Sequence, residues 1–178
     1  MKKYKLTTET LQFAGRTLHR IKAVKDFDSI KAGEFGGWIE NEKNLSQDDN
    51  AWIYGDAMVF DNAEVYDNAN VSGNANVSGN AEVSDYAEVS DYAKVYGNAA
   101  IKGDAKVHDA VDYIVFKNFW SSGRYFTWTS SNNKWSVGCF YGTGEELIKK
   151  AYADSDTSGR EYERVVRYVE SILADERK

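Results

Sequence analysis

Few residues of this chain have the types and spacing that chemistry requires. The sequence holds two histidines, His19 and His108, and an imidazole is the commonest general base in enzymes. Together with the single cysteine, Cys139, they show no metal-ligand spacing, so we expect no metal site. Cys139 also lacks a basic neighbour in sequence. The apolar residues beside it, Val137 and Phe140, indicate a core thiol and not a nucleophile.

A second candidate is the segment Gly142-Thr143-Gly144, which precedes a predicted helix. Backbone N–H groups at a helix N-terminus can bind a phosphate. Glu145 and Glu146 would repel such an anion, and Thr143 followed three residues later by Glu146 is the pattern of a capping box. We therefore predict that Thr143 caps a helix, and we expect no cofactor.

Composition restricts the classes of partner. The formal net charge is −6, from 22 Lys plus Arg against 28 Asp plus Glu. We therefore do not expect a free surface that binds nucleic acid. One cysteine excludes a disulfide framework, and no apolar run approaches the ~20 residues that a membrane span needs. The Lys-rich start has no apolar stretch behind it, as a signal peptide would have, so the expected location is the cytoplasm.

A six-residue repeat in the middle of the chain defines the strands on which any site would lie. Residues 51–110 divide into ten consecutive six-residue blocks without an insertion. The first position is always Ala, the third is always Val or Ile, and the fifth is always Gly or Asp. The first and third side chains point to one face of a short strand, whereas the second and fourth point outward. Gly, Asp and Asn at the corner tolerate a left-handed backbone, so each hexad is predicted to be a strand plus a tight turn.

These Ala-x-Val/Ile-x-Gly/Asp-Asn hexads resemble the hexapeptide-repeat family of left-handed parallel β-helices. The resemblance implies a triangular solenoid with three hexads, or eighteen residues, in each turn, and it alone supplies the left-handed winding. Residues 51–110 would then form about 3.3 turns, with two open ends that need caps. A five-residue solenoid or an amphipathic helix would not keep this register.

The chain is therefore predicted to be mainly β, with a triangular solenoid between an N-terminal β cap and a small C-terminal α+β domain. Residues 1–50 form the cap, in which 33–39 is expected to be a turn and Leu45 starts a degenerate hexad six residues before Ala51. Residues 111–178 are predicted to hold three antiparallel strands and two helices, the second of which begins near Ser158.

The layout also resembles uncharacterised phage and prophage proteins. In these, a Gly-Gly-Trp-Ile/Val cap precedes hexads and a Cys-Phe-x-Gly-Thr segment follows them. The corresponding segments here are residues 36–39 and 139–143.

Many hexapeptide-repeat proteins are acyltransferases, and that resemblance implies a catalytic histidine near a loop that projects from the solenoid. His108, at the outward fourth position of the last hexad, is the one plausible base. No loop interrupts the hexads, so we favour a surface role for His108.

The repeat region carries the acidity of the chain. Residues 51–110 hold ten acidic and three basic residues, a net charge of −7. With eighteen residues in each turn, Glu64 stacks on Glu82 and Asp67 stacks on Asp85. Such a ridge is either an ordinary solvated surface or a contact for a basic partner.

Aromatic residues are the second possible contact. Trp52, Tyr54, Phe60 and Tyr66 occupy outward positions in the first three hexads, and they could bind a partner, be covered by the N-terminal cap, or form a homotrimer interface. The C-terminal segment adds Trp120, Tyr125 and Trp128, of which alternation is expected to bury about half.

We therefore predict a non-enzymatic binding protein of phage or prophage type, an inhibitor or sequestering agent aimed at a host protein such as a nucleic-acid-handling or antiviral-defence component. Direct binding of nucleic acid or membrane is not expected, and a homodimer or homotrimer is possible. One alternative is an oligomeric sponge for an anionic small molecule such as a nucleotide. The other is a hexapeptide-repeat acyltransferase.

Overall fold

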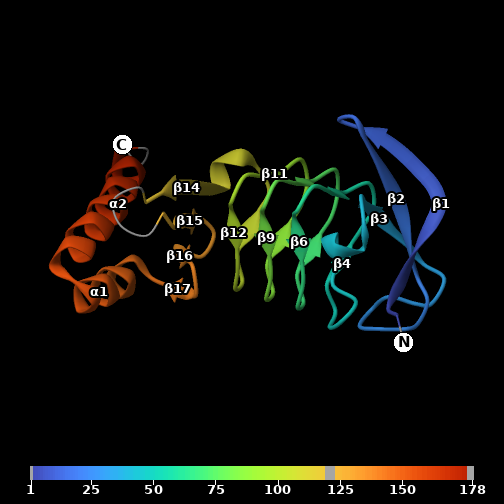
Figure 1. Ribbon diagram of the computed structural model, residues 1–178, viewed down its shortest axis with the longest axis horizontal. Coiled ribbons are helices and arrows are strands. Elements are labelled where there is room, and N and C mark those ends of the chain that lie inside the picture. The colour runs from blue at the N-terminus through green and yellow to red at the C-terminus, as the bar shows by residue number, and fades with distance from the viewer. Residues whose placement is uncertain (1, 119–122, 176–178) are drawn as a thin grey trace.

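Each hexad forms a two-residue strand on its second and third positions and then turns a corner. In the computed structural model, which describes residues 2–118 and 123–175, ten such strands follow one another along the chain (Figure 1). They are β4 (Trp52–Ile53), β5 (Met58–Val59), β6 (Glu64–Val65), β7 (Asn70–Val71), β8 (Asn76–Val77), β9 (Glu82–Val83), β10 (Glu88–Val89), β11 (Lys94–Val95), β12 (Ala100–Ile101) and β13 (Lys106–Val107).

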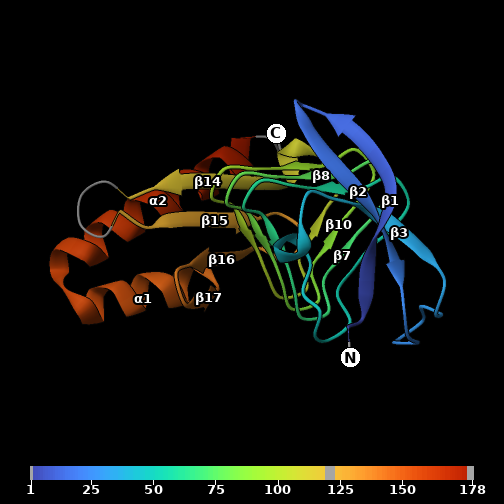
Figure 2. The ribbon, with the colours of Figure 1, turned by 45° about the vertical axis from the view of Figure 1, so that its right-hand side comes forward.

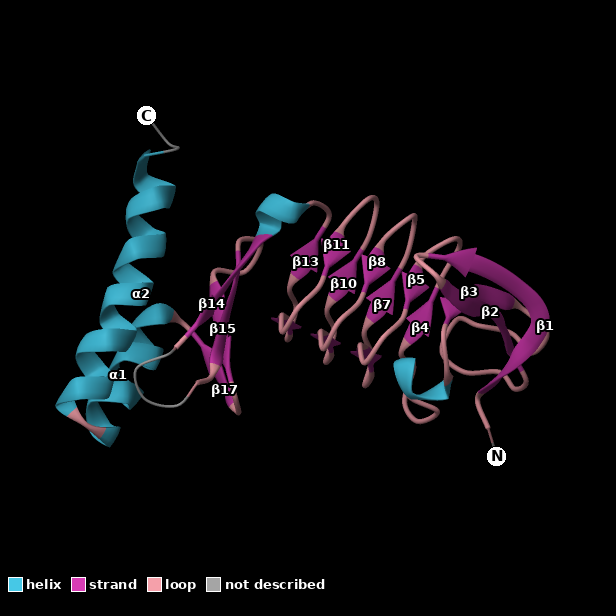
Figure 3. Ribbon diagram, turned by 45° about the horizontal axis from the view of Figure 1, so that its top comes forward, coloured by secondary structure: helices cyan, strands magenta, loops and turns pink. Residues whose placement is uncertain are grey.

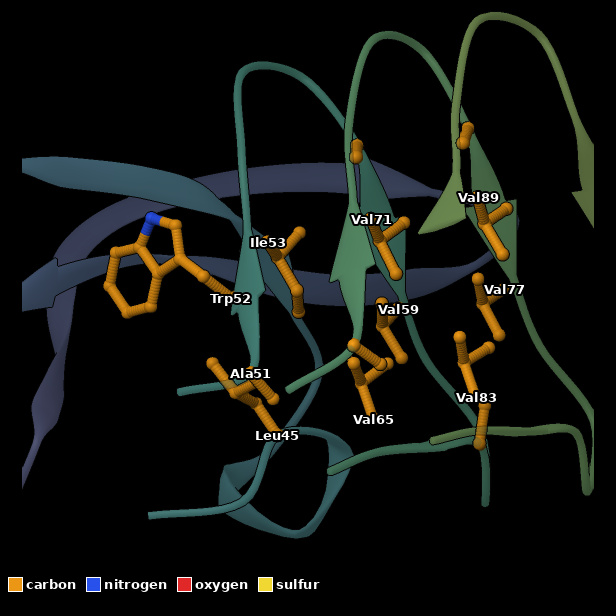
Figure 4. Close-up of a cluster of buried hydrophobic side chains, with 14 of the residues drawn as sticks. Leu45, Ala51, Trp52, Ile53, Val59, Val65, Val71, Val77, Val83 and Val89 are labelled. Atoms are coloured by element: carbon orange, nitrogen blue, oxygen red, sulfur yellow. The ribbon is translucent and has the colours of Figure 1, made fainter. Parts of the chain in front are cut away.

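Strands eighteen residues apart pair in parallel and build the three faces of a solenoid. We name each face by its first hexad strand: the β4 face (β4, β7, β10, β13), the β5 face (β5, β8, β11) and the β6 face (β6, β9, β12). The alanine and Val/Ile rows are at most 1 % exposed and stack along the axis (Figure 4). The predicted parallel β-solenoid is confirmed; the left-handed winding stays a prediction from the resemblance.

The solenoid is longer than the hexads indicate. Residues 33–39 are not a simple turn, because β3 (Phe35–Ile39) pairs in parallel with β5 and places Ile39 beside Val59. Leu45 forms a parallel bridge with Val65 and is 1 % exposed, so it stands in the valine row and not in the alanine row that its distance from Ala51 predicts. These two rungs lengthen the solenoid to about four turns.

A hairpin covers the N-terminal end. Strands β1 (Tyr4–Phe13) and β2 (Arg16–Ala23) are antiparallel, and β2 pairs with β3, so the hairpin extends the β5 face. A short 3₁₀ helix, Glu42–Asn44, leads from β3 to Leu45. The hairpin crosses the end of the solenoid at a steep angle (Figure 2).

The other end carries a four-stranded antiparallel sheet, reached through a 3₁₀ turn at Ala110–Asp112. Its strands are β14 (Tyr113–Lys117), β15 (Tyr125–Thr129), β16 (Lys134–Val137) and β17 (Phe140–Gly142). Three strands are predicted from the sequence; the third is in fact two, because Gly138 turns the chain with a φ of 58°. The predicted turn at residues 121–123 lies partly outside the described residues.

Two helices close this domain. Helix α1 (Gly144–Asp154) is capped by Thr143, whose hydroxyl accepts the Glu146 N–H while the Glu146 carboxylate accepts the Thr143 N–H, so the predicted capping box is confirmed. Helix α2 (Asp156–Asp175) begins two residues before the predicted start. The sheet lies between the helices and the solenoid (Figure 3). Neither helix in the described part of the chain has the length and apolar composition of a membrane span.

Candidate binding groove at the end of the solenoid

The aromatic side chains of the first hexads are mostly covered. Trp52 is 1 % exposed, points away from the valine rows (Figure 4) and packs edge-on against Tyr4 and Phe27 at 6.3 and 5.3 Å between ring centroids. Phe60 is 8 % exposed and packs against Phe13 of the hairpin. The prediction of a partner-binding surface is therefore wrong for Trp52 and Phe60, because the N-terminal cap needs an apolar surface to pack on.

Tyr54 and Tyr66 are half-buried. Tyr54 packs against the solenoid core, and Tyr66 donates its hydroxyl to the Glu82 carboxylate at 3.3 Å. Burial raises the pKa of both phenols above its usual value. Both side chains thus serve the fold, and their contact with a partner stays a prediction.

Most of the stacked acidic residues make contacts within the solenoid. Glu64 and Glu82 pair across neighbouring turns as predicted, and Glu82 forms an ion pair with Lys102 at 3.3 Å. Asp67 and Asp85 occupy corners with φ of 55° and 59°. The Asp67 carboxylate accepts the Asp85 N–H at 3.2 Å, and the Asp85 carboxylate accepts a backbone N–H from the next turn. Binding of a basic partner along this ridge stays a prediction.

The histidines do not assemble a catalytic arrangement with one another. The His108 side chain is 51 % exposed, and its Nδ1 lies 2.7 Å from Ser90 Oγ and 3.1 Å from Asp91 Oδ2. A Ser-His-Asp triad places the serine and the carboxylate on opposite ring nitrogens, whereas both meet the same nitrogen here. His19 lies in β2, at the opposite end of the solenoid, and no described residue bonds its buried Nδ1.

Cys139 is exposed, so the prediction of a core thiol is wrong. It lies in the tight turn between β16 and β17, where the chain reverses before its side chain could reach the core. Among the described residues, no group of His, Cys, Asp and Glu has the geometry to hold a metal ion.

Two hollows lie where the last turn of the solenoid meets the C-terminal sheet. A hollow of about 450 Å³ is lined by Tyr96, Asn98, Tyr113, Ile114 and Tyr125, among others. A second hollow of about 280 Å³ shares Asn98 and Tyr125 with the first. We call the two together the junction groove.

Strand alternation explains which aromatic residues reach the junction groove. Cross-strand partners share one face of the sheet, and Tyr113, Thr129, Lys117 and Tyr125 fall on the face that meets the solenoid. Trp128 lies on the other face, is 3 % exposed and packs under the helices, so its predicted partner contact is wrong. The predicted contact residue Trp120 lies outside the described residues.

The same face of the sheet caps the open end of the solenoid. The last rung of each solenoid face has backbone groups for which no further turn exists. Side-chain hydroxyls take the place of that turn: Tyr113 donates to the Lys94 carbonyl at 2.9 Å, and Thr127 Oγ1 accepts the Ala100 N–H at 2.9 Å. On the β4 face, Ser131 Oγ accepts the Lys106 N–H at 2.8 Å.

Exposed apolar side chains gather beside the junction groove. Tyr96, 62 % exposed, lines it, and so does Ala110, whose neighbour Val111 is 80 % exposed. Tyr92 stands one turn before Ala110 and is 77 % exposed. The sequence analysis missed Tyr92 and Tyr96, although the sequence holds a signal for Tyr96: the fourth position carries serine in the four hexads before it.

The geometry of the solenoid and the six-residue repeat together define this chain as a β-solenoid protein. No known family model matches the chain. The chain is similar to a protein of Escherichia coli (strain K12) named "uncharacterized acetyltransferase YdcK", with 39 % identity over 62 residues, which cover 30 % of this chain. The match covers 19 % of that protein, so the chain corresponds to about a fifth of its length.

Proposed function

We propose that the chain is a non-enzymatic binding protein and that the junction groove is its contact site for a polypeptide partner. The observation that carries this proposal is the exposure of Tyr96, which lines a tyrosine-lined hollow, together with the exposed Val111 and Tyr92, which lie next to and one turn before the lining residue Ala110. Aromatic residues exposed together on a surface are typical of protein interfaces. The solenoid and its caps act as a rigid support for this surface.

The kind of partner follows from the resemblance to phage and prophage proteins. In that setting the partner is a host protein in the bacterial cytoplasm, such as an antiviral-defence component, and binding would inhibit or sequester it. An oligomer of this chain would present several grooves, and solution mass measurement distinguishes monomer, dimer and trimer.

Two neighbouring hexads of identical sequence provide the test. Tyr92 beside the groove and Tyr86, 70 % exposed at another corner, occupy the same position of identical AEVSDY blocks. Capture of partners from bacterial lysate is compared for the native chain, Tyr92→Ser with Tyr96→Ser, and Tyr86→Ser. We expect the groove variant to lose a protein that the Tyr86 variant retains; equal capture by all three would reject the proposal.

An acetyltransferase is the second candidate, and the printed name of the Escherichia coli relative is the observation in its favour. His108 would then act as the general base, with Asp91 beside Nδ1 to orient the ring. Acetyl-CoA binding by calorimetry, with acetyl transfer lost in His108→Ala, would support this candidate. Absence of acetyl-CoA binding by the native chain would remove it.

A further inference from the structure

A ladder of asparagine side chains runs along one corner of the solenoid and ends in the junction groove. Asn62 Nδ2 donates to Asn80 Oδ1 at 3.2 Å, and Asn80 Nδ2 donates to Asn98 Oδ1 at 3.4 Å. Every bond of the ladder runs in the same direction, so its last member offers a donor. None of the residues that the structure describes accepts from Asn98 Nδ2, and Asn98 lines both hollows of the groove.

Backbone N–H groups point the same way. In the preceding turn, the Asn80 N–H donates to the Gly97 carbonyl at 2.7 Å and the Ser84 N–H donates to the Ile101 carbonyl at 3.0 Å. The equivalent groups of the last turn belong to Asn98 and Lys102. Within residues 2–118 and 123–175, neither N–H finds an acceptor, because no further turn follows.

The side chains of Glu82 and Lys102 line the smaller hollow. The Glu82 carboxylate is already engaged by the Lys102 ammonium and the Tyr66 hydroxyl, each at 3.3 Å. Asn98 Nδ2 and the N–H groups of Asn98 and Lys102 therefore have no acceptor among the described residues at this end of the groove. A group of donors without acceptors is the arrangement that a carboxylate or phosphate requires.

We propose that this donor-rich end of the junction groove binds the C-terminal carboxylate of the polypeptide partner, and that the last apolar side chain of the partner enters the larger, tyrosine-lined hollow. This proposal rests on the function proposed above. The two hollows are open to solvent and share the lining residues Asn98 and Tyr125, so they are adjacent and a chain end could contact both. Capture of a chain terminus by backbone donors is a known mode of peptide recognition.

A paired peptide pool tests the proposal. Random short peptides are synthesised twice, once with a free C-terminal carboxylate and once with a C-terminal amide, and their retention on the immobilised full chain is compared. We expect the retained peptides to end in an apolar residue and to lose about tenfold or more in affinity as amides, since a charge-assisted set of hydrogen bonds disappears. Equal retention of both forms would overturn the proposal.

The variant Asn98→Asp tests the carboxylate assignment most directly. The aspartate keeps the shape of the side chain and still accepts from Asn80, but it replaces the free donor by a negative charge. Asn68→Asp is the matched control, because Asn68 likewise accepts from Asn50 Nδ2, at 2.9 Å, on a different corner. We expect Asn98→Asp to weaken peptide binding about tenfold or more and Asn68→Asp to leave it unchanged, with equal melting temperatures for the two variants.

Two further outcomes separate the hypotheses. If Tyr92→Ser with Tyr96→Ser abolishes protein capture while Asn98→Asp does not affect it, the groove is the contact site but the carboxylate assignment is wrong. If AMP binds more tightly than any peptide of the pool and Asn98→Asp abolishes that binding, the anion is a phosphate ester and the peptide assignment is overturned.

Discussion

The ammonium group of Lys3 lies 2.8 Å from the carbonyl oxygen of Ala51, at the open N-terminal end of the solenoid. The same nitrogen donates to the Asp48 and Asp49 carbonyls, and the neighbouring Tyr4 hydroxyl donates to the Leu45 carbonyl at 2.8 Å. Carbonyls of the first turn have no preceding turn from which to accept, so the cap supplies donors. At the other end the last turn leaves both kinds of group, and the C-terminal cap supplies acceptors from Thr127 and Ser131 and a donor from Tyr113.

Because of Lys3, the free energy of unfolding is expected to vary with pH in the alkaline range. Burial lowers the pKa of its ammonium from 10.5 to about 8. Between about pH 8 and 10 the unfolded chain therefore holds more protons than the folded chain, and the free energy of unfolding rises with pH, by about 2 kcal/mol at most. Burial raises the pKa of Tyr4, so above about pH 10 the unfolded chain loses that proton first and stability falls. Urea denaturation across this range measures both slopes.

Substitution separates the contribution of Lys3 from that of other groups. Lys3→Met retains the buried stem and removes the titrating group, so we expect the rise between pH 8 and 10 to disappear. Lys5→Met removes an exposed lysine two residues away and should leave the rise intact. A rise that persists in Lys3→Met would assign it to another group.

The two hydroxyls that accept backbone N–H groups at the C-terminal end, those of Thr127 and Ser131, are expected to contribute unequally to the free energy of unfolding. Thr127 is 2 % exposed, and Thr127→Val keeps its shape but leaves the Ala100 N–H without an acceptor. We expect the free energy of unfolding to fall by about 1–3 kcal/mol. Ser131 is exposed, so water can replace its hydroxyl in Ser131→Ala, and the loss should stay within about 0.5 kcal/mol. Equal losses in the two variants, measured by urea denaturation, would contradict this account.

The hexads were sufficient to predict the solenoid, because their period defines which side chains face the axis. The same period says only that Trp52 points outward; it does not say what lies outside. The N-terminal β cap was therefore one of three alternatives for what contacts Trp52, beside a partner and a homotrimer interface, and residues 1–50 contain no repeat that would place the hairpin over it. Leu45 was misplaced for a related reason: two extra residues separate it from the next rung, and an irregular insertion has no periodic signal.

Part of the junction groove could be predicted from the sequence. Tyr125 and Trp128 are three residues apart in one strand, so alternation alone assigns them to opposite faces of the sheet. Alternation does not say which face meets the solenoid, because that depends on how the whole sheet packs. The hydroxyl of Tyr113 caps a rung nineteen residues away, a contact that no local pattern predicts.

Burial of Trp52 predicts that its removal affects folding before it affects binding. Trp52→Ala opens a cavity among Tyr4, Phe27 and the first turn of the solenoid and should lower the free energy of unfolding by about 3–5 kcal/mol. Tyr86→Ala removes an exposed ring and should change it by less than about 0.5 kcal/mol. Thermal unfolding of the two variants decides: a Trp52→Ala variant as stable as Tyr86→Ala would contradict the observed packing.

Two corner glycines with nearly the same backbone conformation separate strain from crowding. Gly79 and Gly97 have φ of 71° and 73°, a region that costs a residue with a β-carbon about 1–2 kcal/mol. A β-carbon at Gly79 would also lie 2.9 Å from the Gly97 nitrogen in the next turn, whereas one at Gly97 meets nothing within 4 Å. We expect Gly97→Ala to show only the conformational cost and Gly79→Ala to lose at least about 1 kcal/mol more, because backbone atoms of two turns must separate. Urea denaturation of both variants measures the difference, and equal losses would mean that the turns are less closely stacked than they are here.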